Sequence, residues 1–194
     1  GATWSMIYDN LGRQTSLGDP DAGTMSYTYN NFNELIKQVD SRGNTDSLSY
    51  DAIGRIVRKY GAEGTKMYSY DPAGKPGVLS SITYPGGSET YNYDSYARLT
   101  SKVTNIDGVD YTISYGYDSY GRMETTTYPS GFAVKNVFNT YGYLSEVRRN
   151  DNNSLIWKGL SANSFGQLTQ YQYGNNLTTA RSYDSYGILT GIHT

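Results

Sequence analysis

A seven-residue motif, Tyr-Asp-x-x-Gly-Arg-Leu, recurs along this chain of 194 residues and limits the folds available to it. Clear copies begin at Tyr8, Tyr50, Tyr93, Tyr117 and Tyr183. Degenerate copies begin at Tyr29, Tyr70, Phe138 and Ala162, so that successive copies lie 20 to 24 residues apart. Self-similarity at such a period is typical of an architecture in which one small unit is repeated in series.

The motif has the chemistry of a β-turn. Asp suits the first position of a type I turn and Gly the fourth, where a positive φ produces a G1 bulge. Stretches rich in Tyr, Thr, Val and Ile alternate between these turns, and a second turn, such as Asp40–Asn44 or Tyr84–Gly87, lies halfway. Two strands of about seven residues and two turns of about four account for the spacing. We therefore predict that each repeat is one β-hairpin.

The predicted fold class is all-β: a meander of antiparallel hairpins that forms one long, strongly twisted and curved sheet of about 18 strands. Residues 1–194 are expected to form one continuous array of nine hairpin repeats, which is itself a fragment of a larger protein. No helical periodicity is long enough to compete with this interpretation.

The turn type also predicts which residues face each other. Asp opposes the residue after Gly, and the motif Tyr opposes the residue beyond that. The expected aromatic–aliphatic pairs are Tyr29–Leu35, Tyr50–Ile56, Tyr93–Leu99, Tyr117–Met123 and Tyr183–Leu189. Exposed ion pairs are expected on the opposite face: Asp9–Arg13, Asp51–Arg55, Asp94–Arg98 and Asp118–Arg122. One face is thus expected to be rich in Tyr and aliphatic residues, and the other in Ser, Thr and charged residues.

These recurrent positions are assigned a structural role. Catalytic constellations are usually unique, whereas this pairing of carboxylate and guanidinium repeats from turn to turn. The structural repeat positions are Tyr8, Asp9, Gly12, Arg13, Tyr29, Leu35, Tyr50, Asp51, Gly54, Arg55, Tyr70, Asp71, Gly74, Tyr93, Asp94, Arg98, Leu99, Tyr117, Asp118, Gly121, Arg122, Tyr183, Asp184, Gly187 and Leu189.

Composition leaves such a sheet short of a conventional core. Hydrophobic residues make up 37% of the chain, and Tyr alone contributes 22 residues. A flat sheet of this many strands would be roughly 85 Å wide, and sheets that large twist, curl or split. Since no second layer is encoded, we expect the sheet to curve on itself, pack against a partner or enclose something. We also expect the isolated chain to self-associate through its aromatic face or its edge strands.

Several functional classes are disfavoured. The chain has no Cys, which excludes disulfides, thiolate metal sites and a Cys nucleophile. Its one His, His193, lies next to the end of the sequence, which disfavours catalysis by a histidine acid or base. A net charge of −2 without a basic block argues against nucleic-acid binding. No apolar run approaches the ~18 residues of a membrane span. We therefore predict no enzymatic activity, no cofactor, no metal and no membrane insertion.

Two kinds of feature leave alternatives open. The loops Asn105–Asp110 and Asn150–Ser154 carry oxygen ligands suited to Ca²⁺, but they lack the full spacing of a calcium loop, which favours solvated turns. Trp4 and Trp157 could stack on sugars, although tryptophans in β-proteins more often simply pack.

The motif copies, such as Tyr50-Asp51-Ala52-Ile53-Gly54-Arg55-Ile56, resemble the YD repeat of bacterial RHS (rearrangement hot spot) proteins. The segments Asp19–Thr24 and Asp40–Thr45 are similar to the inter-repeat turns of that family. The resemblance covers nearly the whole chain. It implies a β-strand ribbon that spirals into a hollow shell, which in toxin members encloses a C-terminal toxic polypeptide, and it implies a secreted or bacterial cell-surface location. The family's terminal core motif, self-cleaving aspartates and toxin domain are not found in this segment.

Two functions remain from different classes. The first is a structural module of a shell, whose partners are other parts of its own longer chain and an enclosed polypeptide cargo. The second is an extracellular adhesion module that binds carbohydrate or a surface protein through its Tyr-rich faces.

Overall fold

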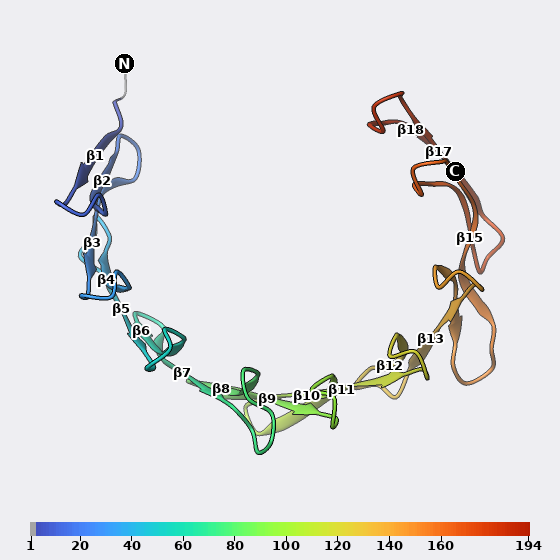
Figure 1. The fold of residues 1–194 in the computed structure, drawn as a ribbon, viewed down its shortest axis with the longest axis horizontal. Coiled ribbons are helices and arrows are strands. Elements are labelled where there is room, and N and C mark those ends of the chain that lie inside the picture. Colours follow the sequence, from blue (N-terminus) through green and yellow to red (C-terminus); the bar gives the residue numbers. More distant parts are fainter. Residues whose placement is uncertain (1–2) are drawn as a thin grey trace. The chain divides into compact units, whose positions relative to one another are not determined.

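The computed structural model describes residues 3–194, which form 18 β-strands and no helix (Figure 1). Residues 1 and 2 of the predicted array lie outside the described part. The strands are β1 (Ser5–Tyr8), β2 (Gln14–Asp19), β3 (Gly23–Tyr29), β4 (Leu35–Val39), β5 (Thr45–Tyr50), β6 (Ile56–Gly61), β7 (Gly64–Tyr70), β8 (Leu79–Tyr84), β9 (Gly87–Tyr93), β10 (Leu99–Ile106), β11 (Val109–Tyr117), β12 (Met123–Thr127), β13 (Ala133–Phe138), β14 (Leu144–Arg149), β15 (Leu155–Ala162), β16 (Leu168–Tyr173), β17 (Thr178–Tyr183) and β18 (Leu189–His193).

The strands are assigned to one 18-stranded sheet and fall into two compact units. The first unit holds β1–β9 with residues 103–110, and the second holds residues 98–102 and 111–194, so that β10 and β11 each contribute to both. Within each unit, every strand pairs antiparallel with the strand that follows it (Figure 1). The predicted all-β meander is confirmed. The prediction that residues 1–194 form one continuous domain stays a prediction.

The motif turns have the predicted geometry. In the first copy, Gly12 N–H donates to the Asp9 carbonyl at 3.0 Å, Asp9 N–H donates to the Arg13 carbonyl at 2.9 Å, and Gly12 has φ 76°. This is a type I turn followed by a G1 bulge. The resulting register shift occurs at the motif tyrosine in both units, and it gives the predicted pairs Tyr29–Leu35, Tyr50–Ile56, Tyr117–Met123 and Tyr183–Leu189. The Tyr93–Leu99 pair joins residues of different units and stays a prediction.

The fourth copy corrects the alignment made from the sequence. Its turn is longer, because Asp71 N–H donates to the carbonyl of Val78, seven positions later instead of four. Tyr70 therefore pairs with Leu79. Gly74 is not the motif glycine of this copy: it is the third residue of a tight inner turn in which Lys75 N–H donates to the Pro72 carbonyl at 2.8 Å. Gly77, with φ 89°, occupies the motif position just before the strand resumes.

Burial confirms that the sheet has no conventional core. Among residues 3–194, only Tyr171 and Thr179 are buried, at 7% and 2% exposure. Their strands carry a small aromatic cluster, in which the Trp157 and Tyr171 rings lie 6.3 Å apart and the Tyr171 and Tyr173 rings meet edge to face at 5.4 Å. Along β3 the burial alternates, with Tyr27 and its face half-buried and the opposite face exposed. The described sheet is therefore a single layer, and along β3 its tyrosine-bearing face is the better covered.

Candidate functional site

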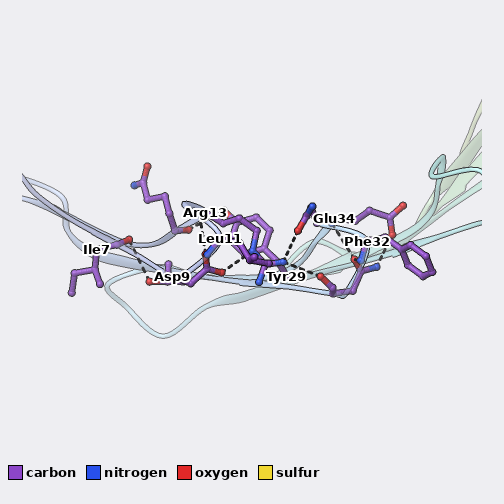
Figure 2. A network of polar contacts seen from close by, with 11 residues as sticks. Ile7, Asp9, Leu11, Arg13, Tyr29, Phe32 and Glu34 are labelled. Carbon is purple, nitrogen blue, oxygen red and sulfur yellow. Dashed lines mark hydrogen bonds and ion pairs between the residues drawn. The ribbon is translucent and has the colours of Figure 1, made fainter.

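The second residue of each well-formed motif copy is an aspartate that closes its own turn. The Asp9 Oδ1 atom accepts the N–H groups of Leu11 at 2.9 Å and Arg13 at 3.0 Å, and Oδ2 accepts Arg13 Nε–H at 2.7 Å (Figure 2). Asp51 and Asp118 make the same three bonds in their copies. The backbone N–H of Arg13 and then its guanidinium lower the pKa of Asp9 below its usual range. The aspartate is thus held as a charged turn cap.

The motif arginine reaches from its own turn to the next repeat. The Arg13 guanidinium lies over the ring of Tyr29 at 5.0 Å from the centroid, and its Nη1 donates to the Asn30 carbonyl and to Asn33 Oδ1, both at 3.0 Å. Figure 2 shows this contact between the first two copies. The same stacking joins Arg55 to Tyr70 at 4.4 Å, Arg98 to Tyr117 at 4.4 Å and Arg122 to Phe138 at 4.2 Å.

The motif tyrosine completes the connection in the opposite direction. Its hydroxyl donates to the backbone carbonyl of the first residue of the even-numbered strand in the preceding repeat. The bonds are Tyr29 to Gln14 at 2.8 Å, Tyr50 to Leu35 at 2.7 Å, Tyr70 to Ile56 at 2.9 Å, Tyr93 to Leu79 at 2.7 Å, Tyr117 to Leu99 at 2.8 Å and Tyr183 to Leu168 at 3.1 Å. We call the arginine stacking and this hydroxyl bond together the inter-repeat clasp.

One copy shows how a missing hydroxyl is replaced. Phe138 stands where the other copies have Tyr and has no hydroxyl to donate. The carbonyl of Met123, which a tyrosine would bind there, accepts Asn136 Nδ2–H at 3.0 Å instead. The carbonyl is therefore satisfied in this copy as well, as expected for a partly covered backbone acceptor.

Two degenerate copies exchange the donor and acceptor roles of the turn. In the second copy Asn30 replaces Asp and donates its side-chain N–H to Glu34 Oε2 at 2.6 Å. In the eighth copy Asn163 donates to Gln167 Oε1 at 2.9 Å, and Gln167 Nε2 donates onward to the Gly187 carbonyl at 2.8 Å. Both asparagines still accept backbone N–H groups through Oδ1. The turn therefore keeps its geometry when its charges change.

The third and fourth copies carry the strongest ionic contact between turns. Arg55 Nη1 and Nη2 donate to Asp71 Oδ1 and Oδ2 at 2.9 Å and 2.6 Å, while Arg55 Nε donates to Asp51 at 2.7 Å. The guanidinium and then the Gly77 N–H lower the pKa of Asp71 to about 2. One arginine thus binds the caps of two successive turns in the fork geometry suited to carboxylates.

Comparison with known proteins agrees with this repeated geometry. The sequence model of the family described as Teneurin YD-shell matches residues 2–194. The chain belongs to this family. It is therefore a structural repeat module of the YD-shell type, as the motif resemblance implied.

Curated relatives of this YD-shell segment include a toxin and a teneurin. Double-stranded DNA deaminase toxin A of Burkholderia cenocepacia (strain H111) is 28% identical over 133 residues, which is 68% of this chain and 9% of the relative. Teneurin-3 of Mus musculus is 25% identical over 159 residues, which is 78% of this chain and 6% of the relative. The segment thus spans less than a tenth of each relative's length.

Solved structures share the fold at low identity. The crystal structure of TcdB2-TccC3 without its hypervariable C-terminal region superposes with a TM-score of 0.81 at 16% identity, covering 97% of this chain and 11% of the other. A Photorhabdus luminescens Tc holotoxin pore carrying a TccC3 mutation gives a TM-score of 0.66 at 16% identity, covering 97% and 12%.

The YD-shell geometry corrects one expectation about the ion pairs. They were expected to be exposed on the face opposite the tyrosines. The Asp9 and Arg13 side chains are each only 23% exposed, and the guanidinium lies over a tyrosine ring. A bulge re-aims the side chains next to it, which explains why simple strand alternation fails at this position.

The other candidate residues lie in separate parts of the described chain. Trp157 packs against Tyr171, whereas Trp4 is 58% exposed. In the loop Asn105–Asp110, Asn105 Nδ2 donates to Asp110 Oδ1 at 2.6 Å. In the loop Asn150–Ser154, Asp151 pairs with Arg149 at 2.6 Å. Across the described chain, no group of three or more His, Asp or Glu residues is arranged to hold a metal ion, and no helix is long and apolar enough to cross a membrane.

Sequence reasoning found the turns but missed the clasp. The repeat period placed each motif tyrosine, yet its hydroxyl was not assigned a partner. The repeat period could have indicated this bond, because each motif tyrosine stands at the same place in its repeat and its hydroxyl reaches the corresponding carbonyl of the repeat before. The polar groups of the motif are thus engaged in joining one hairpin to the next.

Proposed function

We propose that this YD-shell segment forms part of a β-strand wall that encloses and shields a polypeptide cargo, such as a C-terminal toxin. Its partners would then be the rest of its own longer chain and the enclosed polypeptide. The single observation that supports this role most directly is the inter-repeat clasp. The clasp uses the recurrent arginine and tyrosine side chains to join each hairpin to the next, as a continuous wall requires. Such a wall would select its cargo by enclosing it and not by binding it at one site.

The half-buried tyrosine-bearing face supplies the second argument. Tyrosine combines a broad apolar ring with a polar tip, so it suits a partly wetted surface that contacts varied polypeptide without binding one sequence. On this proposal the wall acts by exclusion, keeping an unfolded or toxic chain from the cell until release. We also infer a secreted or cell-surface location, in keeping with the toxin and teneurin relatives.

The test is limited proteolysis of the full-length parent protein, followed by mass spectrometry of the fragments that stay together. We expect a polypeptide outside the repeat array to be retained and protected. The matched control is the same cargo sequence expressed alone and digested under identical conditions. Cleavage of the cargo at the same rate in both samples would overturn the proposal.

Adhesion is the second candidate, because Trp4 and Tyr60 are 58% and 50% exposed and aromatic rings stack on sugars. It predicts that the repeat array resists protease alone, with nothing retained, and that it binds in a glycan screen. Loss of that binding in a Trp4→Ala, Tyr60→Ala variant of unchanged fold would support adhesion over enclosure.

A further inference from the structure

A row of exposed apolar side chains marks the tips of the motif turns. The fourth motif residue, which lies just before the glycine position, is large and apolar in eight of the nine copies. These residues, which we call the tip residues, are Leu11 (70% exposed), Phe32 (84%), Ile53 (74%), Tyr96 (79%), Tyr120 (83%), Tyr141 (84%), Phe165 (73%) and Tyr186 (88%). They are among the most exposed large hydrophobic residues of the described chain.

The fold places the tips of each unit along one edge. All motif turns connect an odd-numbered strand to the even-numbered strand that follows. In an antiparallel meander such turns lie at the same ends of the strands. The first unit therefore presents Leu11, Phe32, Ile53 and Tyr96 along one edge, and the second unit presents its own four tip residues in the same way.

Turn chemistry does not require these side chains. The third position of a type I turn accepts small polar residues readily, and the position before each tip residue is indeed uncharged and mostly small, as in Asn10, Ser95, Ser119 and Ser185. Single exposed hydrophobic residues need no explanation, but a regular row of them indicates an interaction surface. The tip dipeptides themselves carry no charge, although the Arg122 guanidinium lies over the tip ring of Tyr120, 4.9 Å from its centroid.

The distance between neighbouring tip residues indicates which kind of partner can match the row. One hairpin advances the edge by two strands, about 9.6 Å. A helix brings a side chain to the same face every 5.4 Å per turn, or about 10.5 Å per seven residues, and so drifts out of step with the tips. A strand repeats on one face about every 6.8 Å. A second row of YD turn tips advances by the same step of one hairpin per tip, and the first unit has one gap in its row, between Ile53 and Tyr96, where the fourth copy has Ala73.

The available area predicts the strength of the contact. An aromatic side chain buries about 150–250 Å², so the four aromatic tips of the second unit offer roughly 600 Å² per copy. Stable interfaces bury about 800 Å² per partner. A contact through one unit's row is thus expected to be weak and dependent on concentration, and to strengthen with each added repeat.

We propose that the tip residues form a self-association surface, which binds the turn tips of a second copy of this chain. The inference goes beyond cargo enclosure and does not depend on it. The sequence suggested self-association through the aromatic face or the edge strands. This proposal places the contact at the turn tips.

Sedimentation velocity over a range of concentrations tests this proposal. We expect the native chain to move from its 21.5 kDa monomer towards a dimer as concentration rises. A variant with serine at all eight tip residues should associate at least tenfold more weakly. The matched control replaces eight other exposed apolar residues by serine: Tyr60, Met67, Ile106, Val109, Tyr111, Leu160, Leu177 and Ile192. It should associate as the native chain does. A monomeric native chain, or a tip variant that associates normally, would overturn the proposal.

Cysteine cross-linking gives a second measurement that leaves the tips intact. The chain has no Cys, so Ser119→Cys, Thr140→Cys, Ser164→Cys and Ser185→Cys add the only thiols. Neighbouring turns are about 9.6 Å apart, too far for a disulfide within one copy. We expect covalent dimers on mild oxidation. Thiols on the opposite turns, from Ser130→Cys, Asn152→Cys and Asn175→Cys, should yield few. Equal yields from the two edges, or none from the tips, would contradict the proposal.

Discussion

Replacing Tyr50 by Phe tests the clasp with the smallest change that the structure allows. The hydroxyl donates to the Leu35 carbonyl at 2.7 Å, and burial together with the Glu34 charge raises the pKa of Tyr50. Phe keeps the ring and its packing and removes only this donor. An intramolecular hydrogen bond contributes about 0.5–1.5 kcal/mol net, and the carbonyl left behind loses its partner. We therefore expect Tyr50→Phe to lower the free energy of unfolding by about 1 kcal/mol.

Urea denaturation at pH 7, followed by circular dichroism, measures this loss. For a chain of this length, about 1 kcal/mol corresponds to a fall in Tm of roughly 2–4 °C. The matched control is Tyr141→Phe, because that side chain lies at a turn tip and is 84% exposed. The control should change the free energy of unfolding by less than about 0.5 kcal/mol, as surface substitutions usually do.

Two results would refute this reasoning. The first is a Tyr50→Phe variant as stable as the native chain, which would mean that water replaces the hydroxyl at no cost. The second is an equal loss in both variants, which would assign the effect to the chemistry of tyrosine rather than to the clasp. The clasps of separate repeats should also add, so Tyr50→Phe with Tyr183→Phe should cost about twice as much as either alone.

Four further substitutions and one pH titration have expected outcomes. Ala97→Gly should stabilise by about 0.5 kcal/mol in urea melts, because Ala97 has φ 60°, a left-handed conformation that costs an L-residue about 1–2 kcal/mol. Gly54→Val and Gly121→Val should each destabilise by more than about 1 kcal/mol, since their φ values are 82° and 79°; unchanged melting in both would contradict the turn assignment. Asp71 has its pKa lowered to about 2, so its contribution is complete above about pH 4 and is lost as pH falls through 2; Asp71→Asn should flatten that part of an acid titration of stability. Tyr50 has a raised pKa, so its contribution is present below about pH 10 and is lost as pH rises through the folded value, which absorbance of tyrosinate should follow.

Local chemistry made the fold predictable from the sequence. Asp-x-x-Gly specifies a turn whose bulge sets the register, and the register in turn fixes pairs such as Tyr29–Leu35. The same reasoning failed in the fourth copy, where Gly74 and Gly77 both follow Asp71 and only the hydrogen bonds show which glycine precedes the strand. The Asp-x-x-Gly spacing selects Gly74, whereas the turn is three residues longer and places Gly77 before the strand.

The clasp was harder to predict because it joins atoms of neighbouring repeats. Arg13 was assigned only to Asp9, its partner within the turn, although its guanidinium also reaches Tyr29 and Asn30. Arginine has five donors, and a pairing rule that considers one turn at a time leaves most of them unassigned. The tip residues escaped notice for a similar reason: exposure at a turn is ordinary for one copy and becomes informative only across all of them.

The exchanges within the chain show what the architecture requires of its sequence. Asp with Arg, Asn with Glu and Asn with Gln all close the same turn, and Asn136 satisfies the carbonyl that a tyrosine hydroxyl would otherwise bind. Each solution preserves a donor–acceptor pairing rather than a residue type. An array that accepts several solutions at every turn can change most of its residues and keep its register. This explains how a chain can share 16% of its residues with TcdB2-TccC3 and still superpose with a TM-score of 0.81. The bulge position keeps one backbone geometry, the left-handed region, in every such turn: most copies place Gly there, and Asn33 and Ala97 take it at φ 66° and 60°.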